Sequence, residues 1–170
     1  MKLIKEICHD PQIKCDTYKV RKAARTILVN DKDQIAILNV TNLGFHKICG
    51  GGIEFDEDIE TALRREVSEE TGAEIEIIDE LGLTIEWKNT YKAQQISYCY
   101  ISKVKGEPGN PQFTDSEKSD GFVLEWHTLE EAIKTASQDK PTDYHAKYMS
   151  ERDLIFLIEY RNKTLYNEKR

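Results

Sequence analysis

The sequence lacks a long hydrophobic run. Its longest uninterrupted apolar stretch is the five residues 154–158, whereas a membrane-spanning helix needs roughly 20 apolar residues in succession. Charged and polar side chains between positions 5 and 10 interrupt the apolar residues of the first twelve positions, so this segment does not form the apolar core of a secretory signal. We therefore expect no membrane-spanning helix and a cytoplasmic location.

Cysteine and proline are scarce as well. The four cysteines form no CxxC pair and are too few for a disulfide scaffold in a chain of 170 residues. We expect free, buried thiols at Cys8, Cys15, Cys49 and Cys99. No repeat, low-complexity tract or Pro- or Ser-rich linker divides the chain, so we expect one compact domain over residues 1–170.

Basic residues are outnumbered by acidic ones. The chain has 24 Lys and Arg against 31 Asp and Glu, a net charge of −7, which argues against nonspecific binding to nucleic acid and gives no reason to expect a specific nucleic-acid partner. Residues 54–80 hold twelve acidic side chains and two arginines, and the remainder of the chain is therefore slightly basic. The acidic segment is either a solvated face or a holder of cations that in turn hold an anionic substrate.

Alternating strand and helix signals predict an α/β protein. Apolar and β-branched runs on either side of a turn-rich tetrapeptide predict a β-hairpin of residues 23–29 and 35–40. A short strand, residues 47–49, then meets Gly50, Gly51 and Gly52, where a sharp turn or a close backbone approach is expected. A helix is predicted from residue 59 to residue 71, with Gly72 as its left-handed C-cap.

The second half of the chain continues this pattern. Further strands are predicted at residues 74–78, 81–87, 95–104 and 122–127. The loop 106–121 is a candidate substrate-facing element. A capping box at Thr128 starts a short helix to residue 137, and a last helix covers residues 146–161. The predicted fold is a mixed sheet flanked by helices.

The charged residues of the predicted last helix are explained by its structure alone. Arg152 and Asp153 open the apolar stretch 154–158, and we interpret them as the exposed side of a helix whose other side is buried.

Carboxylates share a face with the apolar residues of the helix 59–71. At about 100° per residue, Glu66 and Glu70 point in nearly the same direction as its apolar side chains. Like charges placed together repel one another, and partial burial adds a desolvation cost. Either these glutamates reach outward or pair with Arg65 and lysines from elsewhere, or they hold a divalent ion such as Mg²⁺, which favours carboxylate oxygens.

The residues around this helix follow a longer pattern. Gly51 is followed after five residues by Glu57 and after seven more by the run Arg-Glu-Val-Ser-Glu-Glu-Thr-Gly-Ala, residues 65–73. This resembles the Nudix box, and every specified position of the box is matched when Ala73 is taken as its final apolar residue. Asp56 stands where family members often have Gly, and Cys49 where they commonly have Pro, but neither position is specified by the box.

The resemblance to the Nudix hydrolase family implies both a fold and an activity. The fold is a mixed sheet sandwiched between helices (α/β/α), and the activity is hydrolysis of nucleoside diphosphates linked to another moiety. By resemblance, Glu66, Glu69 and Glu70 ligate Mg²⁺ or Mn²⁺, Glu57 contributes from the preceding loop, and Arg65 orients a glutamate.

The resemblance also gives the glycines a role, since Gly51 and Gly52 would let the backbone approach metal and phosphate. The general base in this family lies on the helix or on a loop outside the box. Outside the box, Glu117 and Asp120 are the candidates, unless they simply form a solvated acidic loop. We expect a small-molecule nucleotide substrate, no membrane partner, and homodimerisation as an open alternative.

Substrate contacts are less sharply indicated. Tyr91 lies eighteen residues after Ala73, and a tyrosine at about this distance resembles one in dinucleoside-polyphosphate hydrolases of the family. Tyr91, Trp87 or Phe113 would stack on a base, unless they are core residues. Candidate phosphate contacts are Arg25, Lys47 and His46.

The alternative function is a Nudix-like domain that senses a nucleotide without cleaving it. Loss of turnover would most simply appear as a substituted metal ligand, but Glu66, Glu69 and Glu70 are all present. The intact carboxylates therefore favour the enzyme.

Overall fold

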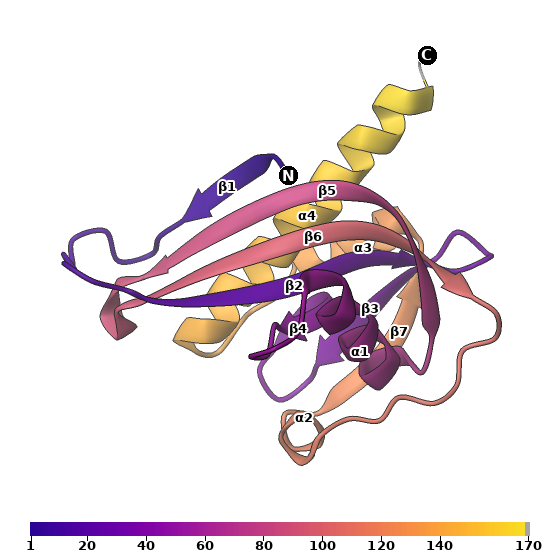
Figure 1. Ribbon diagram of the computed structural model, residues 1–170, viewed down its shortest axis with the longest axis horizontal. Coiled ribbons are helices and arrows are strands. Elements are labelled where there is room, and N and C mark those ends of the chain that lie inside the picture. Colours follow the sequence, from indigo (N-terminus) through magenta and orange to yellow (C-terminus); the bar gives the residue numbers. More distant parts are fainter. Residues whose placement is uncertain (169–170) are drawn as a thin grey trace.

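The computed structural model describes residues 1–168. In this part of the chain, seven strands form one mixed sheet with the order β1-β5-β6-β2-β4-β3-β7 (Figure 1). The strands are β1 (Leu3–Ile7), β2 (Lys19–Val29), β3 (Ile35–Val40), β4 (Phe45–Gly52), β5 (Glu74–Lys88), β6 (Ala93–Lys105) and β7 (Phe122–His127). The helices are α1 (Ile59–Thr71), α2 (Asp115–Ser119), α3 (Leu129–Ser137) and α4 (Tyr144–Glu168), with a 3₁₀ turn η1 (Asn89–Tyr91). None of the described helices is long and apolar enough to cross a membrane.

Strand β4 lies between the two strands that were predicted to form a hairpin. β2 and β3 run antiparallel, but they pair only next to their turn, at Val29 and Ile35. Beyond that point β4 pairs antiparallel with both of them. The predicted antiparallel pair is therefore confirmed next to its turn. Farther from the turn the two strands do not pair with each other, because β4 lies between them.

The three glycines after residue 49 follow the second of the two predicted alternatives, a close backbone approach. They complete β4 instead of forming a turn, and Gly50, Gly51 and Gly52 face Arg25, Ala24 and Ala23 of β2. Gly50 has φ 125°, a conformation that side-chain-bearing residues rarely adopt. A Cβ on Gly50 would lie 2.1 Å from the carbonyl oxygen of Ala24. The glycines thus permit close approach of β4 to β2.

Most predicted elements are confirmed within a few residues. β3, α1 and β7 have the predicted bounds, and α3 begins at its Thr128 cap. The strands predicted at 74–78 and 81–87 are one strand, β5, whose register shifts twice between Ile77 and Gly82. α4 is longer than predicted at both ends, and β1 and α2 were not predicted.

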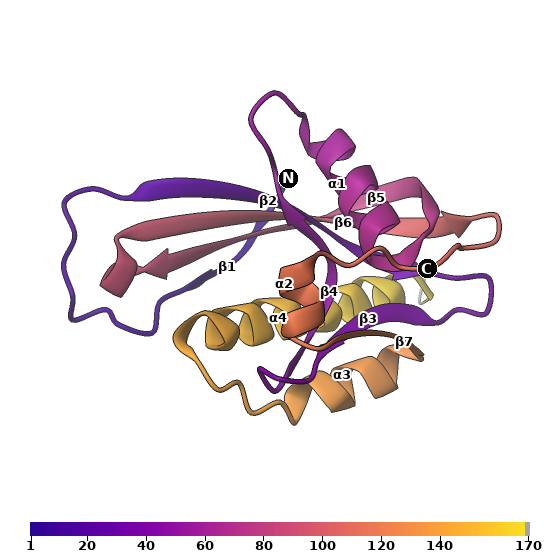
Figure 2. The ribbon, with the colours of Figure 1, turned by 90° about the horizontal axis from the view of Figure 1, so that it is seen from below.

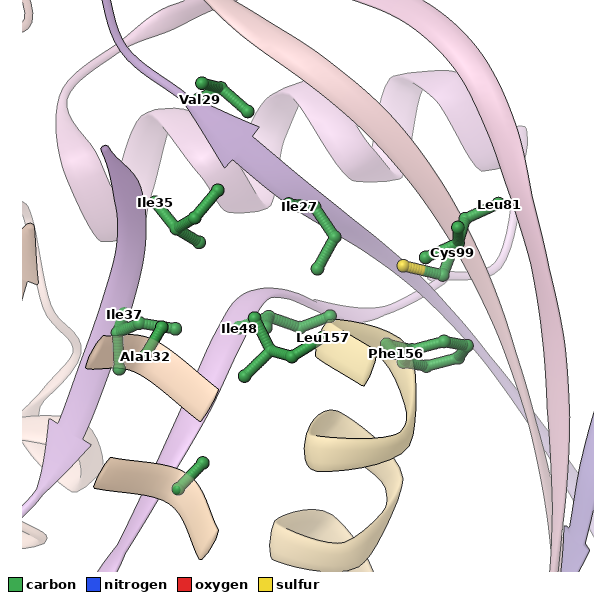
Figure 3. Close-up of a cluster of buried hydrophobic side chains, with 11 residues drawn as sticks. Ile27, Val29, Ile35, Ile37, Ile48, Leu81, Cys99, Ala132, Phe156 and Leu157 are labelled. Atoms are coloured by element: carbon green, nitrogen blue, oxygen red, sulfur yellow. The ribbon is translucent and has the colours of Figure 1, made fainter. Parts of the chain in front are cut away.

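Helices cover both faces of the sheet, as Figure 2 shows. On one face, Ala62, Leu63 and Val67 of α1 pack against a cluster that includes Leu28 and Cys49. On the other face, α3 and α4 cover a cluster that includes Ile27, Ile48, Phe156 and Leu157 (Figure 3). The predicted α/β/α arrangement is therefore confirmed.

Candidate active site

Helix α1 begins and ends at the predicted residues for local reasons. The Asp58 carboxylate accepts a hydrogen bond of 2.7 Å from the Thr61 amide at the N-terminus. Gly72 ends the helix with φ 69°, and its amide donates to the Ser68 carbonyl. These caps fix the start and end of the helix and thereby place its glutamates against β4.

Glu70 lies at the buried junction of α1 and β4. One of its carboxylate oxygens is 2.5 Å from Lys47 Nζ, and the other accepts a 2.7 Å hydrogen bond from the Gly50 amide. Arg25, also buried, donates to the Gly50 carbonyl. Burial raises the pKa of Glu70, and the positive charge of Lys47 opposes this rise. Glu70 therefore holds the glycine-bearing end of β4 against α1.

Three other box glutamates surround Arg65. Its guanidinium lies 2.6 Å from Glu57, 2.9 Å from Glu66 and 3.4 Å from Glu69. It also donates a 3.0 Å hydrogen bond to the carbonyl of Gly52. The hydrogen bonds from Arg65 lower the pKa of Glu57, whereas partial burial raises the pKa of Glu69. Arg65 thus gathers carboxylates from the loop and from the helix at one place.

Gly51 lies against the Glu66 carboxylate, which leaves no room for a side chain at position 51. A Cβ built on Gly51 would lie 2.2 Å from the Glu66 carboxylate, so only glycine leaves that carboxylate its present place. Carboxylate oxygens are the ligands that Mg²⁺ prefers, and the Glu57, Glu66 and Glu69 set therefore fits a hard divalent cation. Among residues 1–168, no three His, Cys, Asp or Glu side chains are already arranged around one metal position. In this structure the single positive charge of Arg65 offsets part of the negative charge of the three glutamates.

The two cations predicted to contact phosphate have partners inside the protein. Lys47 is paired with Glu70 and lies over the ring of Phe122. Arg25 donates a hydrogen bond to the Gly50 carbonyl. Both side chains are buried. Their observed contacts position β4 and α1, and direct contact with phosphate stays a prediction.

The two candidate bases lie in and next to α2, with Glu117 at the middle of the helix and Asp120 directly after its last residue. The Glu117 carboxylate caps that helix by accepting hydrogen bonds from the Thr114 amide and hydroxyl. Its charge also contributes to the raised pKa of Glu69, behind the larger effect of burial. Asp120 ends α2, and its carbonyl accepts from the amide of Asn42. The structure therefore brings Glu117 toward the helix glutamates and ties the Asp120 backbone to the β3–β4 turn.

The three aromatic residues predicted to stack on a base have partners inside the protein. Tyr91, in η1, packs its ring against Tyr144 and His145, and Figures 1 and 2 place this turn well away from α1. The indole of Trp87 donates to Glu6, and Phe113 packs edge-on against Phe122. Trp87 and Tyr91 therefore contact other elements, whereas Phe113 follows Gln112, whose amide donates a 2.6 Å hydrogen bond to the Glu69 carbonyl.

His46, the third candidate phosphate contact, is also engaged. Its ring lies 2.7 Å from Asp139.

A buried charge network on the α4 face was missed by the sequence analysis. Arg152 and Asp153, predicted to be exposed, are 0% and 1% exposed. Arg152 pairs with Asp153 at 2.6 Å and with Glu86 of β5 at 3.1 Å. The Asp153 carboxylate accepts a 3.2 Å hydrogen bond from the amide of Ile48. The network therefore fixes β4, which carries the glycines of the site, from the opposite face of the sheet.

A family model described as NUDIX domain matches residues 19–150. No curated protein matches the chain.

Many solved structures are similar to this chain, and three of them illustrate the likeness. A NUDIX hydrolase from Nitrosomonas europaea has a TM-score of 0.62 at 17% identity, with 85% of this chain and 90% of that chain covered. An ADP-ribose pyrophosphatase from Streptococcus suis has a TM-score of 0.53 at 18% identity, with 83% and 92% covered. A UDP-X diphosphatase has a TM-score of 0.55 at 15% identity, with 90% and 68% covered. These likenesses show the fold.

Proposed function

The chain belongs to the NUDIX family, whose members are typically pyrophosphohydrolases, and from this premise we propose that it hydrolyses a pyrophosphate linkage in a nucleoside diphosphate joined to another moiety. The observation that carries the proposal is the gathering of Glu57, Glu66 and Glu69 around Arg65. A purely structural helix has no need for this set of carboxylates. Nor does it need glycine at position 51, where a side chain would displace the Glu66 carboxylate.

Mg²⁺, or Mn²⁺ in its place, would be held by Glu57, Glu66 and Glu69. When bound, such an ion supplies positive charge that offsets the charge on the pyrophosphate oxygens in the transition state. We assign Glu70 a positioning role next to these ligands, because Lys47 and the Gly50 amide already occupy its carboxylate. Direct ligation by Glu70 remains the prediction from the family pattern.

The remaining residues of the site have separate tasks. Arg65 holds the carboxylates in place until the cation binds. Glu117 is the proposed general base, and its carboxylate would accept the proton of the attacking water. Asp120 is the second candidate for this role. The ADP-ribose and UDP-X named for two similar structures are consistent with a nucleoside diphosphate substrate, since both compounds contain one.

The proposal is tested by turnover with and without metal. Phosphate-coupled hydrolysis is measured on nucleoside triphosphates, dinucleoside polyphosphates, ADP-ribose and other sugar nucleotides, with Mg²⁺ or with EDTA. Glu69→Gln is compared with Glu60→Gln, a matched control on the same helix. The Glu60 side chain is 63% exposed and pairs with Arg64. We expect turnover with Mg²⁺, a loss of at least about 100-fold in Glu69→Gln, and little change in the control.

The contrary result is equally specific. If no substrate turns over with Mg²⁺ but a nucleotide still binds, the enzyme proposal fails and the sensor interpretation replaces it.

A further inference from the structure

A groove lies beside the carboxylate cluster, between the start of β2 and the β4–α1 loop. Its volume is about 750 Å³, and residues 19–22 and 53–57 line it together with Ala93. β4 pairs with β2 only from Ala23 onward, and the loop then leaves the sheet after a 3.0 Å hydrogen bond from the Ile53 amide to the Lys22 carbonyl. Figure 2 shows this loop projecting from the sheet ahead of α1. Glu57, at the end of the loop, belongs to both the groove and the cluster.

The loop side of the groove presents an unusually exposed aromatic ring. Phe55 is 91% exposed, and Val20 on the opposite wall is 52% exposed. A fully exposed phenylalanine gains nothing from hydrophobic burial, so its presence beside a reactive site calls for a partner that covers it. A nucleobase is such a partner, because a flat π-system stacks on an aromatic ring.

The β2 side of the groove is positively charged. Lys19, Arg21 and Lys22 line it, and none of the three forms an ion pair with another residue in the described part of the chain. Acidic residues of the loop line the facing wall, where Glu57 is already paired with Arg65. In a protein of net charge −7, three cations without carboxylate partners are available to an anionic ligand.

Arg21 connects this cationic wall to the carboxylate cluster. Its Nη1 donates a 2.9 Å hydrogen bond to Gln95, which is 5% exposed and donates in turn to Ser97. Its Nη2 would lie 2.7 Å from a Cβ on Gly52, and the carbonyl of Gly52 accepts from Arg65. A buried amide therefore orients the Arg21 guanidinium over the strand that carries the site, where it can donate to a phosphate.

We propose that this groove binds the base-bearing arm of the substrate, with the nucleobase stacked on Phe55 and the adjoining phosphate held by Arg21. The inference rests on the proposed function, because it names the part of the same site that selects nucleotides. Phe55 is a specificity-determining residue, since it contacts the base and not the scissile linkage.

Equilibrium binding tests this separately from turnover. Calorimetry with Mg²⁺ present compares ADP with inorganic pyrophosphate in the wild type, Phe55→Ala, Phe55→Tyr and Arg21→Gln. Val123→Ala is the matched control, because Val123 is an exposed apolar residue (46%) on β7 that does not line the groove. Phe55 is too exposed for its replacement to threaten folding, and circular dichroism checks this for each variant.

The expected pattern separates the base from the phosphates. Phe55→Ala weakens ADP binding about tenfold and leaves pyrophosphate binding unchanged, because one stacking contact is lost. Phe55→Tyr restores the affinity for ADP, and Arg21→Gln weakens both ligands. Val123→Ala changes neither.

Two outcomes overturn the inference. One is an ADP affinity that stays within about twofold in Phe55→Ala, and the other is a wild type that binds pyrophosphate but not ADP. Either result leaves the proposed function intact if nucleotides are still hydrolysed. Conversely, ADP binding that depends on Phe55 without any turnover supports the groove and refutes the hydrolase.

Discussion

Replacement of Lys47 by Met tests whether the buried pair with Glu70 holds the site together. The side chains of Lys47 and Glu70 are 8% and 1% exposed, with 2.5 Å between Nζ and the nearer carboxylate oxygen. Methionine fills similar space but removes the charge, so Glu70 keeps only the Gly50 amide as a partner. Removing one member of such a pair costs about 3–5 kcal/mol, because the other charge is left buried and uncompensated. This is a large part of the roughly 5–15 kcal/mol that stabilises a typical domain.

The loss is measured by urea unfolding followed by tryptophan fluorescence, with EDTA present to exclude bound metal. At a slope of about 2 kcal/mol per M urea, the midpoint falls by about 1.5–2.5 M. The double variant Lys47→Met/Glu70→Gln recovers part of the loss, because no uncompensated charge remains. A double-mutant cycle then gives a coupling energy of at least about 2 kcal/mol.

The loss of unfolding free energy in Lys47→Met is expected to increase with pH. Burial holds the pKa of Glu70 above its ordinary value, and the charge of Lys47 opposes this. Removing Lys47 raises that pKa further, so the folded variant takes up a proton that the unfolded chain does not hold. Its stability therefore falls as the pH rises above the ordinary glutamate range, and the deficit is smaller at pH 5 than at pH 8. A deficit below about 1 kcal/mol, or a coupling energy below about 0.5 kcal/mol, would refute the pairing as an energetic contact.

Two further predictions concern other parts of the molecule. Gly51→Ala places a methyl group 2.2 Å from the Glu66 carboxylate. Because that carboxylate ends a flexible side chain and can move away, we expect the melting temperature to change by only a few degrees, while turnover falls about 100-fold. A variant with full turnover would contradict the steric argument. Asp10→Asn concerns acid stability: burial alone raises the pKa of Asp10, but hydrogen bonds from Thr90 and Tyr144 outweigh it and hold that pKa at about 2. The carboxylate therefore stabilises the fold above its unfolded pKa of about 4, and this contribution is lost as the pH falls through about 2. Unfolding free energies of wild type and variant measured from pH 7 to pH 2 should converge at the acid end, and a constant difference would contradict the assignment.

The parts of the site that follow from local chemistry were predictable from the sequence. The apolar spacing of α1, the cap at its start and Gly72 at its end are all encoded within about four residues of where they act. The same holds for the spacing of Glu66, Glu69 and Arg65, which puts their side chains on neighbouring turns of one helix.

Features that depend on distant partners were not predictable. Arg152 reads as a surface charge because its partner, Glu86, lies 66 residues earlier in the chain and on a strand. Arg25 and Lys47 likewise read as free cations, since nothing in the sequence shows that Gly50 and Glu70 face them. For the glycines of β4, a sharp turn and a close approach both stayed open in the sequence, because the choice depends on their pairing with β2.

The parallel pairing of β2 with β6 has a consequence for synthesis on the ribosome. These strands pair from Lys19 and Ala93 through Val29 and Lys103, so the strand that supports β4 gains its second neighbour only when residues 93–103 have emerged. At about 5–20 residues per second, that delay after completion of residue 73 is on the order of a few seconds. During this interval a nascent chain carries the four glutamates of the box, but the edge of β2 that later pairs with β6 is still open. The glutamates of α1 are therefore translated before β6, the strand that completes the pairing of β2 beside β4.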